Sequence, residues 1–153
     1  MNKSVKTVSV LGSTGSVGTQ ALDVIKELGL DVVMITGHKN IKLIAEQIKE
    51  FSPEIACVAD CDTARELEKM IGNCTTKVIF GEEQMSDALE AHCADVTVHA
   101  IAGLAGLASA LKASRTPTRL AMANKEAVIC AGTFWYLFLT PVDKKSPASK
   151  VEG

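Results

Sequence analysis

Short runs rich in valine and isoleucine alternate with segments of helix length along most of the chain. The apolar runs are 7–11, 31–35, 55–59, 77–80, 96–101 and 119–123. In the intervening segment 41–51, apolar side chains recur every three or four residues at Ile41, Ile44, Ile48 and Phe51, as on one face of a helix. Strands that alternate with helices are typical of a parallel sheet, and unbroken apolar runs indicate strands buried on both faces. The sequence therefore predicts an α/β fold with a doubly wound, mainly parallel sheet and helices on both faces.

Composition limits the classes of partner. The chain has 153 residues, 47% of them hydrophobic, which suits one domain with a substantial core. Its 16 basic and 18 acidic side chains give a net charge of −2, so we expect no general attraction to nucleic acid or to a membrane. The first residues include no cleavable apolar segment, so we expect a cytoplasmic protein. Five cysteines without a CxxC pair argue against a disulfide framework and a zinc site.

A glycine-rich loop, GSTGSVG, joins the first apolar run to a helical segment. Gly12, Gly15 and Gly18 are three residues apart, a relative of the dinucleotide-binding GxGxxG pattern. In that context one glycine permits a tight turn, one lets the backbone approach a pyrophosphate and one lets the helix pack closely on the strand. The anion would lie at the helix N-terminus, among hydroxyl donors from Ser13, Thr14 and Ser16. The alternative is an ordinary tight turn; with the strand pattern, we favour a Rossmann-like domain.

The loop after the second apolar run indicates which dinucleotide would bind. An enzyme that uses NAD places Asp or Glu there, on the ribose hydroxyls. This chain has Thr36, Gly37, His38, Lys39 and Asn40, without a carboxylate, which favours the 2′-phosphate of NADP. Alternatively, Lys39 is a solvated turn residue and Asn40 caps the helix that begins at Ile41. Both interpretations can hold together.

Two further places follow predicted strands, where open α/β sheets bind ligands. Asn124, Lys125 and Glu126 follow run 119–123 and are candidates for cofactor or substrate contacts, or else form an exposed helix start in which Glu126 complements the helix dipole. Gly103 and Gly106 follow run 96–101, on the side where a nicotinamide would lie. Those glycines could equally belong to a small-residue loop packed on the sheet.

These segments together resemble one enzyme family. VLGSTGSVGTQALDVI, GHKN, FSPEIACVAD, AIAGLAGLASALKA and LAMANKEAVICAG, between about residues 8 and 132, are similar to 1-deoxy-D-xylulose 5-phosphate reductoisomerase, the NADPH-dependent enzyme of the methylerythritol phosphate route to isoprenoids. The resemblance implies pyrophosphate contacts from Thr14, Gly15, Ser16 and Val17 and 2′-phosphate contacts from His38, Lys39 and Asn40, with His38 acting through its backbone. It also implies cofactor contacts from Asn124 and Glu126, and a contact between Lys125 and the phosphorylated ketose substrate.

The resemblance also implies a divalent metal, Mg, Mn or Co, which promotes rearrangement of the ketose phosphate before hydride reduction to 2-C-methyl-D-erythritol 4-phosphate. The family's metal ligands begin in a PVDSEH motif. This chain has Pro141, Val142 and Asp143, followed by Lys144 and Lys145. A lone carboxylate beside two lysines suits a hard cation poorly. We therefore expect no metal site, with Asp143 only a weak candidate, and no catalytic residue.

The composition changes near residue 133. Four of the six aromatic residues fall within 134–138, and the residues after them are polar and rich in lysine. We expect an NADP-binding domain at 1–133 and an aberrant or disordered tail at 134–153 in place of the family's catalytic domain. The first hypothesis is therefore a truncated family member that binds NADPH without turnover, with a family-like homodimer possible. The alternative is a stand-alone NADP-binding or regulatory module without catalysis.

Overall fold

The fold is that of a computed structural model, which describes residues 4–123. In this part of the chain, strands and α-helices alternate from β1 to β6, with one short 3-10 helix, η1. The strands are β1 (Thr7–Leu11), β2 (Asp31–Thr36), β3 (Ile55–Val58), β4 (Lys77–Phe80), β5 (Val96–His99) and β6 (Arg119–Met122). The helices are α1 (Ser16–Glu27), α2 (Ile41–Phe51), α3 (Cys61–Ile71), α4 (Gly81–Ala91), η1 (Leu104–Gly106) and α5 (Leu107–Ser114).

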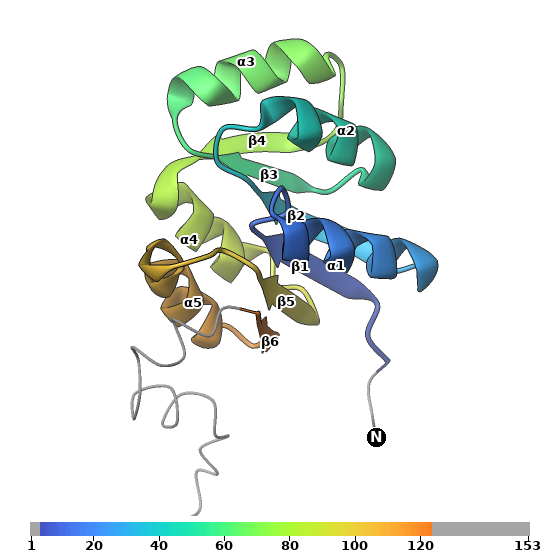
Figure 1. Cartoon of the computed structure of the whole chain (residues 1–153), viewed down its shortest axis with the longest axis vertical. Helices are drawn as coiled ribbons and strands as arrows, with labels where there is room; N and C mark the ends of the chain where they lie inside the picture. Colours follow the sequence, from blue (N-terminus) through green and yellow to red (C-terminus); the bar gives the residue numbers. More distant parts are fainter. Residues whose placement is uncertain (1–3, 124–153) are drawn as a thin grey trace, which may run out of the picture.

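The strands form one parallel sheet in the order β4-β3-β2-β1-β5-β6 (Figure 1). The chain moves outward from β1 to β4 and then returns past β1 to add β5 and β6. Because crossovers between parallel strands are right-handed, this reversal of direction puts α4 and α5 on the opposite face from α1, α2 and α3. The predicted doubly wound, Rossmann-like sheet with helices on both faces is confirmed.

Each face of the sheet has its own hydrophobic core. Val10 of β1 belongs to the cluster that includes Ile48 of α2, whereas the next residue, Leu11, belongs to the cluster that includes Leu89 of α4. Side chains alternate along a strand, so a central strand needs apolar residues at every position. β2 and β3 are buried along almost their whole length, as the unbroken apolar runs predict. The edge strands β4 and β6 are partly exposed.

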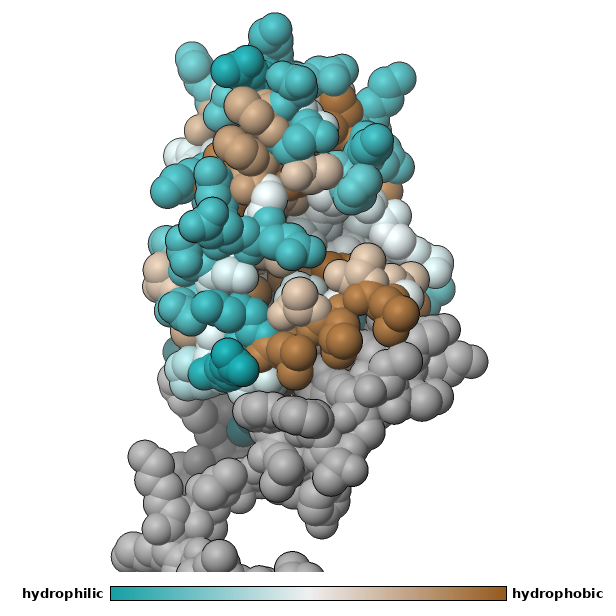
Figure 2. All heavy atoms as spheres, turned by 90° about the vertical axis from the view of Figure 1, so that its left-hand side faces the viewer, coloured by the Kyte–Doolittle hydropathy of each residue, from teal (hydrophilic) through white to brown (hydrophobic). Residues whose placement is uncertain are grey.

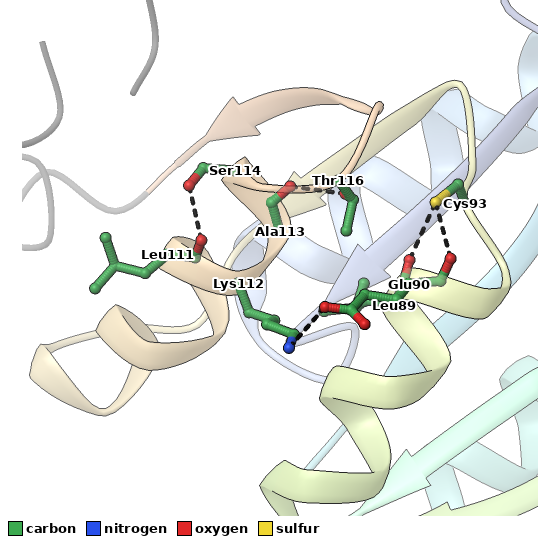
Figure 3. A network of polar contacts seen from close by, with 8 residues as sticks. All are labelled: Leu89, Glu90, Cys93, Leu111, Lys112, Ala113, Ser114 and Thr116. Atoms are coloured by element: carbon green, nitrogen blue, oxygen red, sulfur yellow. Dashed lines mark hydrogen bonds and ion pairs between the residues drawn. The ribbon is translucent and has the colours of Figure 1, made fainter. Parts of the chain in front are cut away.

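Helices α4 and α5, which cover the same face of the sheet, are joined by an ion pair. Lys112 Nζ of α5 lies 2.7 Å from Glu90 Oε1 of α4, and Figure 3 shows the two side chains meeting between the helices. The segment between the last two apolar runs does not form one continuous helix, because its first residues form η1 before α5 begins at Leu107. Among residues 4–123, no helix is long and apolar enough to span a membrane.

At the edge of the sheet where the strands begin, Asp95 joins β1 to β5. Its Oδ2 accepts hydrogen bonds from Lys6 N (3.0 Å), Thr7 N (3.1 Å) and Thr7 Oγ1 (3.1 Å). In return, Asp95 N donates to Thr7 Oγ1 at 3.0 Å. These bonds fix the pairing of two strands that are far apart in the sequence. The predicted boundary near residue 133 and the predicted tail at 134–153 lie outside the described residues.

Candidate nucleotide-binding crevice

A cavity of about 530 Å³ runs along the carboxyl ends of β1 to β5. It is lined by the residues that follow these strands and by the first turns of α4 and α5. The cavity includes the point between β1 and β5 where the strand order reverses, which is where open α/β sheets bind ligands. Figure 2 shows that this side of the molecule has a lower rim of apolar residues, and Leu104 of η1 is 64% exposed. We call this cavity the crevice.

Two of the three loop glycines are required by the fold. Gly12 has φ +84°, and a Cβ there would lie 2.9 Å from the carbonyl carbon of Ala100. A Cβ on Gly18 would lie 2.1 Å from Gly12 O, so the absent side chain lets α1 pack on β1. Gly15 differs, because its φ is −78° and the nearest atom to an added Cβ would be 3.6 Å away. The fold tolerates a side chain at Gly15, which lines the crevice.

The N-terminus of α1 opens toward the crevice through Gly15. Its first turn has no acidic residue and no side-chain cap. In contrast, α2 is capped by Asn40 Oδ1 and α3 by Asp60 Oδ1. The N–H groups of a first helical turn and the helix dipole attract negative charge when no side chain satisfies them. This end of α1 therefore suits an anion.

The serine after Gly12 does not face the crevice. Ser13 is fully buried, and its Oγ donates to Gln47 Oε1 at 2.7 Å and approaches Thr36 O at 3.2 Å. Gln47 Nε2 donates in turn to Ser13 O at 2.9 Å. The prediction that Ser13 is a hydroxyl donor to the anion was wrong, because these interior partners occupy it. Thr14 lines the crevice, and Ser16 is exposed.

The loop after β2 forms one end of the crevice. Gly37 and His38 line it, and His38, Lys39 and Asn40 are exposed. Asn40 Oδ1 accepts from Leu43 N at 3.4 Å, which confirms the predicted cap of α2. The pKa of the Asp60 carboxyl is lowered, mainly by hydrogen bonds from Thr63 and to a smaller extent by the charge of Lys39. Lys39 therefore lies close enough to Asp60, at the start of α3, for the two charges to interact.

The other end of the crevice is formed by small residues after β5, including Ala102, Ala105 and Ser109. Behind them lies His99, which is fully buried and whose Nε2 is 2.9 Å from Ser109 Oγ. Sequence analysis did not identify this pair. A histidine at the end of an otherwise apolar strand is the signal that would have indicated it. Burial lowers the pKa of His99, so the ring is neutral near pH 7.

The remaining predicted residues divide into two groups. Val17 is 43% exposed in the first turn of α1 and is not among the residues that line the crevice. Asn124, Lys125, Glu126 and Asp143 lie outside the described residues. Within residues 4–123, no group of three or more His, Cys, Asp or Glu side chains could hold a metal ion.

Sequence comparisons agree with this geometry. The profile of the 1-deoxy-D-xylulose 5-phosphate reductoisomerase family matches residues 8–132. The reductoisomerase of Lachnospira eligens is 36% identical over 129 residues, which cover 84% of this chain and 34% of that protein. The reductoisomerase of Paraburkholderia xenovorans is 36% identical over 154 residues, covering 94% and 38%.

Solved structures show the same likeness. The reductoisomerase from Zymomonas mobilis in complex with NADPH superposes with a TM-score of 0.82 at 31% identity, covering 89% of this chain and 36% of that one. A reductoisomerase in complex with NADPH, fosmidomycin and magnesium gives a TM-score of 0.80 at 27% identity, covering 88% and 34%. The chain thus spans about a third of the length of the relatives it matches.

Proposed function

This chain belongs to the 1-deoxy-D-xylulose 5-phosphate reductoisomerase family, and from that premise we propose that it binds NADPH along the crevice. The observation that supports this most directly is the crevice itself, which crosses the reversal of strand order and includes Gly15 at the N-terminus of α1. The solved relative from Zymomonas mobilis is described as a complex with NADPH. Adenosine would lie on the β2 and β3 side, and the nicotinamide on the β5 side.

We propose that the pyrophosphate lies on the loop between β1 and α1. Thr14, Gly15, Ser16 and Val17 surround the uncapped first turn of α1, where backbone N–H groups favour an anion. Gly15 lets the ligand approach the backbone, because no side chain stands between them. The Thr14 and Ser16 hydroxyls would add hydrogen bonds. Ser13 has no part in this contact, since its hydroxyl is bonded within the core.

The 2′-phosphate would lie at the loop after β2. Lys39 is exposed there and supplies a positive charge, and no acidic residue occurs between Thr36 and Asn40. Asn40 uses its Oδ1 to cap α2, which leaves its amide N–H groups for the phosphate. His38 lines the crevice and would contribute its backbone. This arrangement selects NADPH over NADH through charge.

For the family's reaction, we propose that this chain supplies the NADPH-binding part and that residues 1–133 form the corresponding domain. Bound NADPH supplies hydride, and the residues described here bind and orient it. Asn124 and Glu126 remain proposed cofactor contacts, and Lys125 a proposed contact to the phosphorylated ketose. The described residues do not fit a divalent metal, so we derive no step through one. We expect NADPH binding without turnover of the ketose phosphate in the presence of Mn²⁺, and steady NADPH oxidation would contradict this.

A second candidate is a stand-alone NADP-binding module without catalysis. Binding measurements do not separate the two, but the adjacent genomic sequence does. A downstream continuation that encodes the family's DSEH motif would favour the reductoisomerase interpretation.

Fluorescence titration of the full chain with NADPH and NADH tests the binding site. In Gly15→Ala, the added methyl group meets ordinary protein contacts but stands where the pyrophosphate would approach. We expect NADPH affinity to fall at least ~10-fold, equivalent to about 1.4 kcal/mol, with a change in unfolding free energy below about 1 kcal/mol. Glu27→Ala is the control, because Glu27 is exposed at the other end of α1. Equal affinities of both variants for NADPH would contradict the proposed site.

Lys39→Gln tests the choice of cofactor. Loss of a charge-assisted contact should weaken NADPH binding roughly 10-fold and leave NADH binding unchanged. The control is Lys42→Gln, which removes an exposed lysine from the first turn of α2. If Lys39→Gln weakened NADH as much as NADPH, the loop would not recognise the 2′-phosphate.

A further inference from the structure

We propose that His99 is a positioning residue, which through Ser109 holds the wall of the crevice against which the nicotinamide would lie. The inference rests on the proposed binding of NADPH. It concerns a side chain that does not line the crevice itself and acts through one that does.

The hydrogen bonds define one arrangement of protons. Ser109 Oγ donates its single hydrogen to Gly106 O at 3.0 Å. The short contact of 2.9 Å between Ser109 Oγ and His99 Nε2 must therefore be donated by the imidazole. The ring is thus the tautomer with hydrogen on Nε2. A chain of two bonds connects the end of β5 to the carbonyl that ends η1.

Close packing reinforces these bonds. A Cβ on Gly106 would lie 2.6 Å from His99 Cε1 and 2.9 Å from Ile101 O, so the backbone of η1 sits directly against the ring. Ala105 and Ser109, on either side of Gly106, both line the crevice. His99 itself pairs in register with Leu11 of β1 and Met122 of β6. The ring therefore fixes where η1 and the start of α5, which form this wall of the crevice, lie relative to the sheet.

Packing alone does not explain an imidazole at this place. Within the described residues, His99 Nδ1 is buried and has no hydrogen-bond partner. A buried polar atom without a partner costs free energy, and an apolar side chain of similar size would fill the space without this cost. The donor at Nε2 is the feature that an apolar residue could not supply. We infer that position 99 requires a side chain that can donate a hydrogen bond to Ser109 Oγ.

The test compares two ligands that share the adenosine half. Wild-type chain should bind both NADPH and adenosine 2′,5′-bisphosphate, which lacks the nicotinamide. His99→Leu should weaken NADPH binding about 10-fold and leave the bisphosphate unchanged. His99→Gln, whose Nε2 can occupy the donor position, should restore NADPH affinity to within about threefold of wild type. His92→Leu is the control, because His92 is exposed and pairs with Glu54 away from the crevice.

Ser109→Ala provides a second variant in case His99→Leu does not fold. This variant removes the hydroxyl that contacts His99 Nε2 and keeps the imidazole ring. We again expect weaker binding of NADPH and unchanged binding of the bisphosphate. If a folded variant lost affinity for both ligands equally, or for neither, the positioning role would be wrong. If wild type bound no NADPH, the proposed function itself would fail.

Discussion

The side chain of Gln47 should contribute strongly to stability, because it binds the glycine loop from inside the core. Gln47 is 5% exposed and makes two hydrogen bonds to Ser13, one to its hydroxyl and one to its carbonyl. Gln47→Met keeps the length of the side chain and removes both bonds. Each bond contributes about 1 kcal/mol, and a buried carbonyl left without its donor costs about 1–3 kcal/mol.

The better burial of methionine offsets part of this loss, by about 1 kcal/mol. The expected net decrease in the free energy of unfolding is therefore about 2–4 kcal/mol. This corresponds to a fall in Tm of roughly 6–16 °C for a domain of this size. Urea unfolding followed by circular dichroism at 222 nm measures the decrease, and a thermal scan measures the shift.

Glu46→Met is the control, since Glu46 precedes Gln47 on α2 and is exposed. It introduces the same side chain without breaking a buried contact and should change stability by less than about 0.5 kcal/mol. If the two variants differed by less than about 0.5 kcal/mol, Gln47 would not hold the loop and the argument from its hydrogen bonds would be refuted.

Two further predictions concern buried positions. Gly18→Ala should destabilise the protein by roughly 2–4 kcal/mol in urea unfolding, because the Cβ would lie 2.1 Å from Gly12 O. Helix propensity alone predicts stabilisation by about 1 kcal/mol, so a stabilised variant would refute the steric argument. Burial raises the pKa of the Cys57 thiol from 9.0 to about 12, so the thiol ionises first in the unfolded chain and stability falls above pH 9. The decrease in the free energy of unfolding that Cys57→Ala causes should therefore be roughly 1.4 kcal/mol smaller at pH 10 than at pH 8. An equal decrease at both pH values would contradict the raised pKa.

The regular elements could be predicted because each rests on a local pattern. β1, β4 and α2 have the predicted bounds, and the other strands differ by at most two residues at an end. A strand buried on both faces must be apolar throughout, and a helix packed on a sheet must have one apolar stripe. The strand order could not be derived from these patterns, since pairing depends on contacts between distant segments.

The candidate site was predicted less completely. Spacing indicates which residues lie in a loop but not which way each side chain points, so Ser13 was assigned to the wrong side. A signal was present in Gln47, a polar residue on the apolar stripe between Ile44 and Ile48. His99 was missed because its role depends on η1, which packs against it in the folded chain. The fold and the roles of Gly12 and Gly18 followed from sequence, whereas the inward hydrogen bonds did not.

The return of β5 to the centre of the sheet has a consequence for the order of assembly. Thr7 and Asp95 are 88 residues apart in the chain, so their pairing cannot form before Asp95 has been synthesised. A nascent chain that ends at Ala91 contains the residues proposed to bind adenosine but none of those proposed to bind the nicotinamide, which begin at Ala100. During synthesis, the two halves of the ligand site are therefore completed one after the other. A ligand that spans both halves stabilises only the chain in which the last pairing has formed.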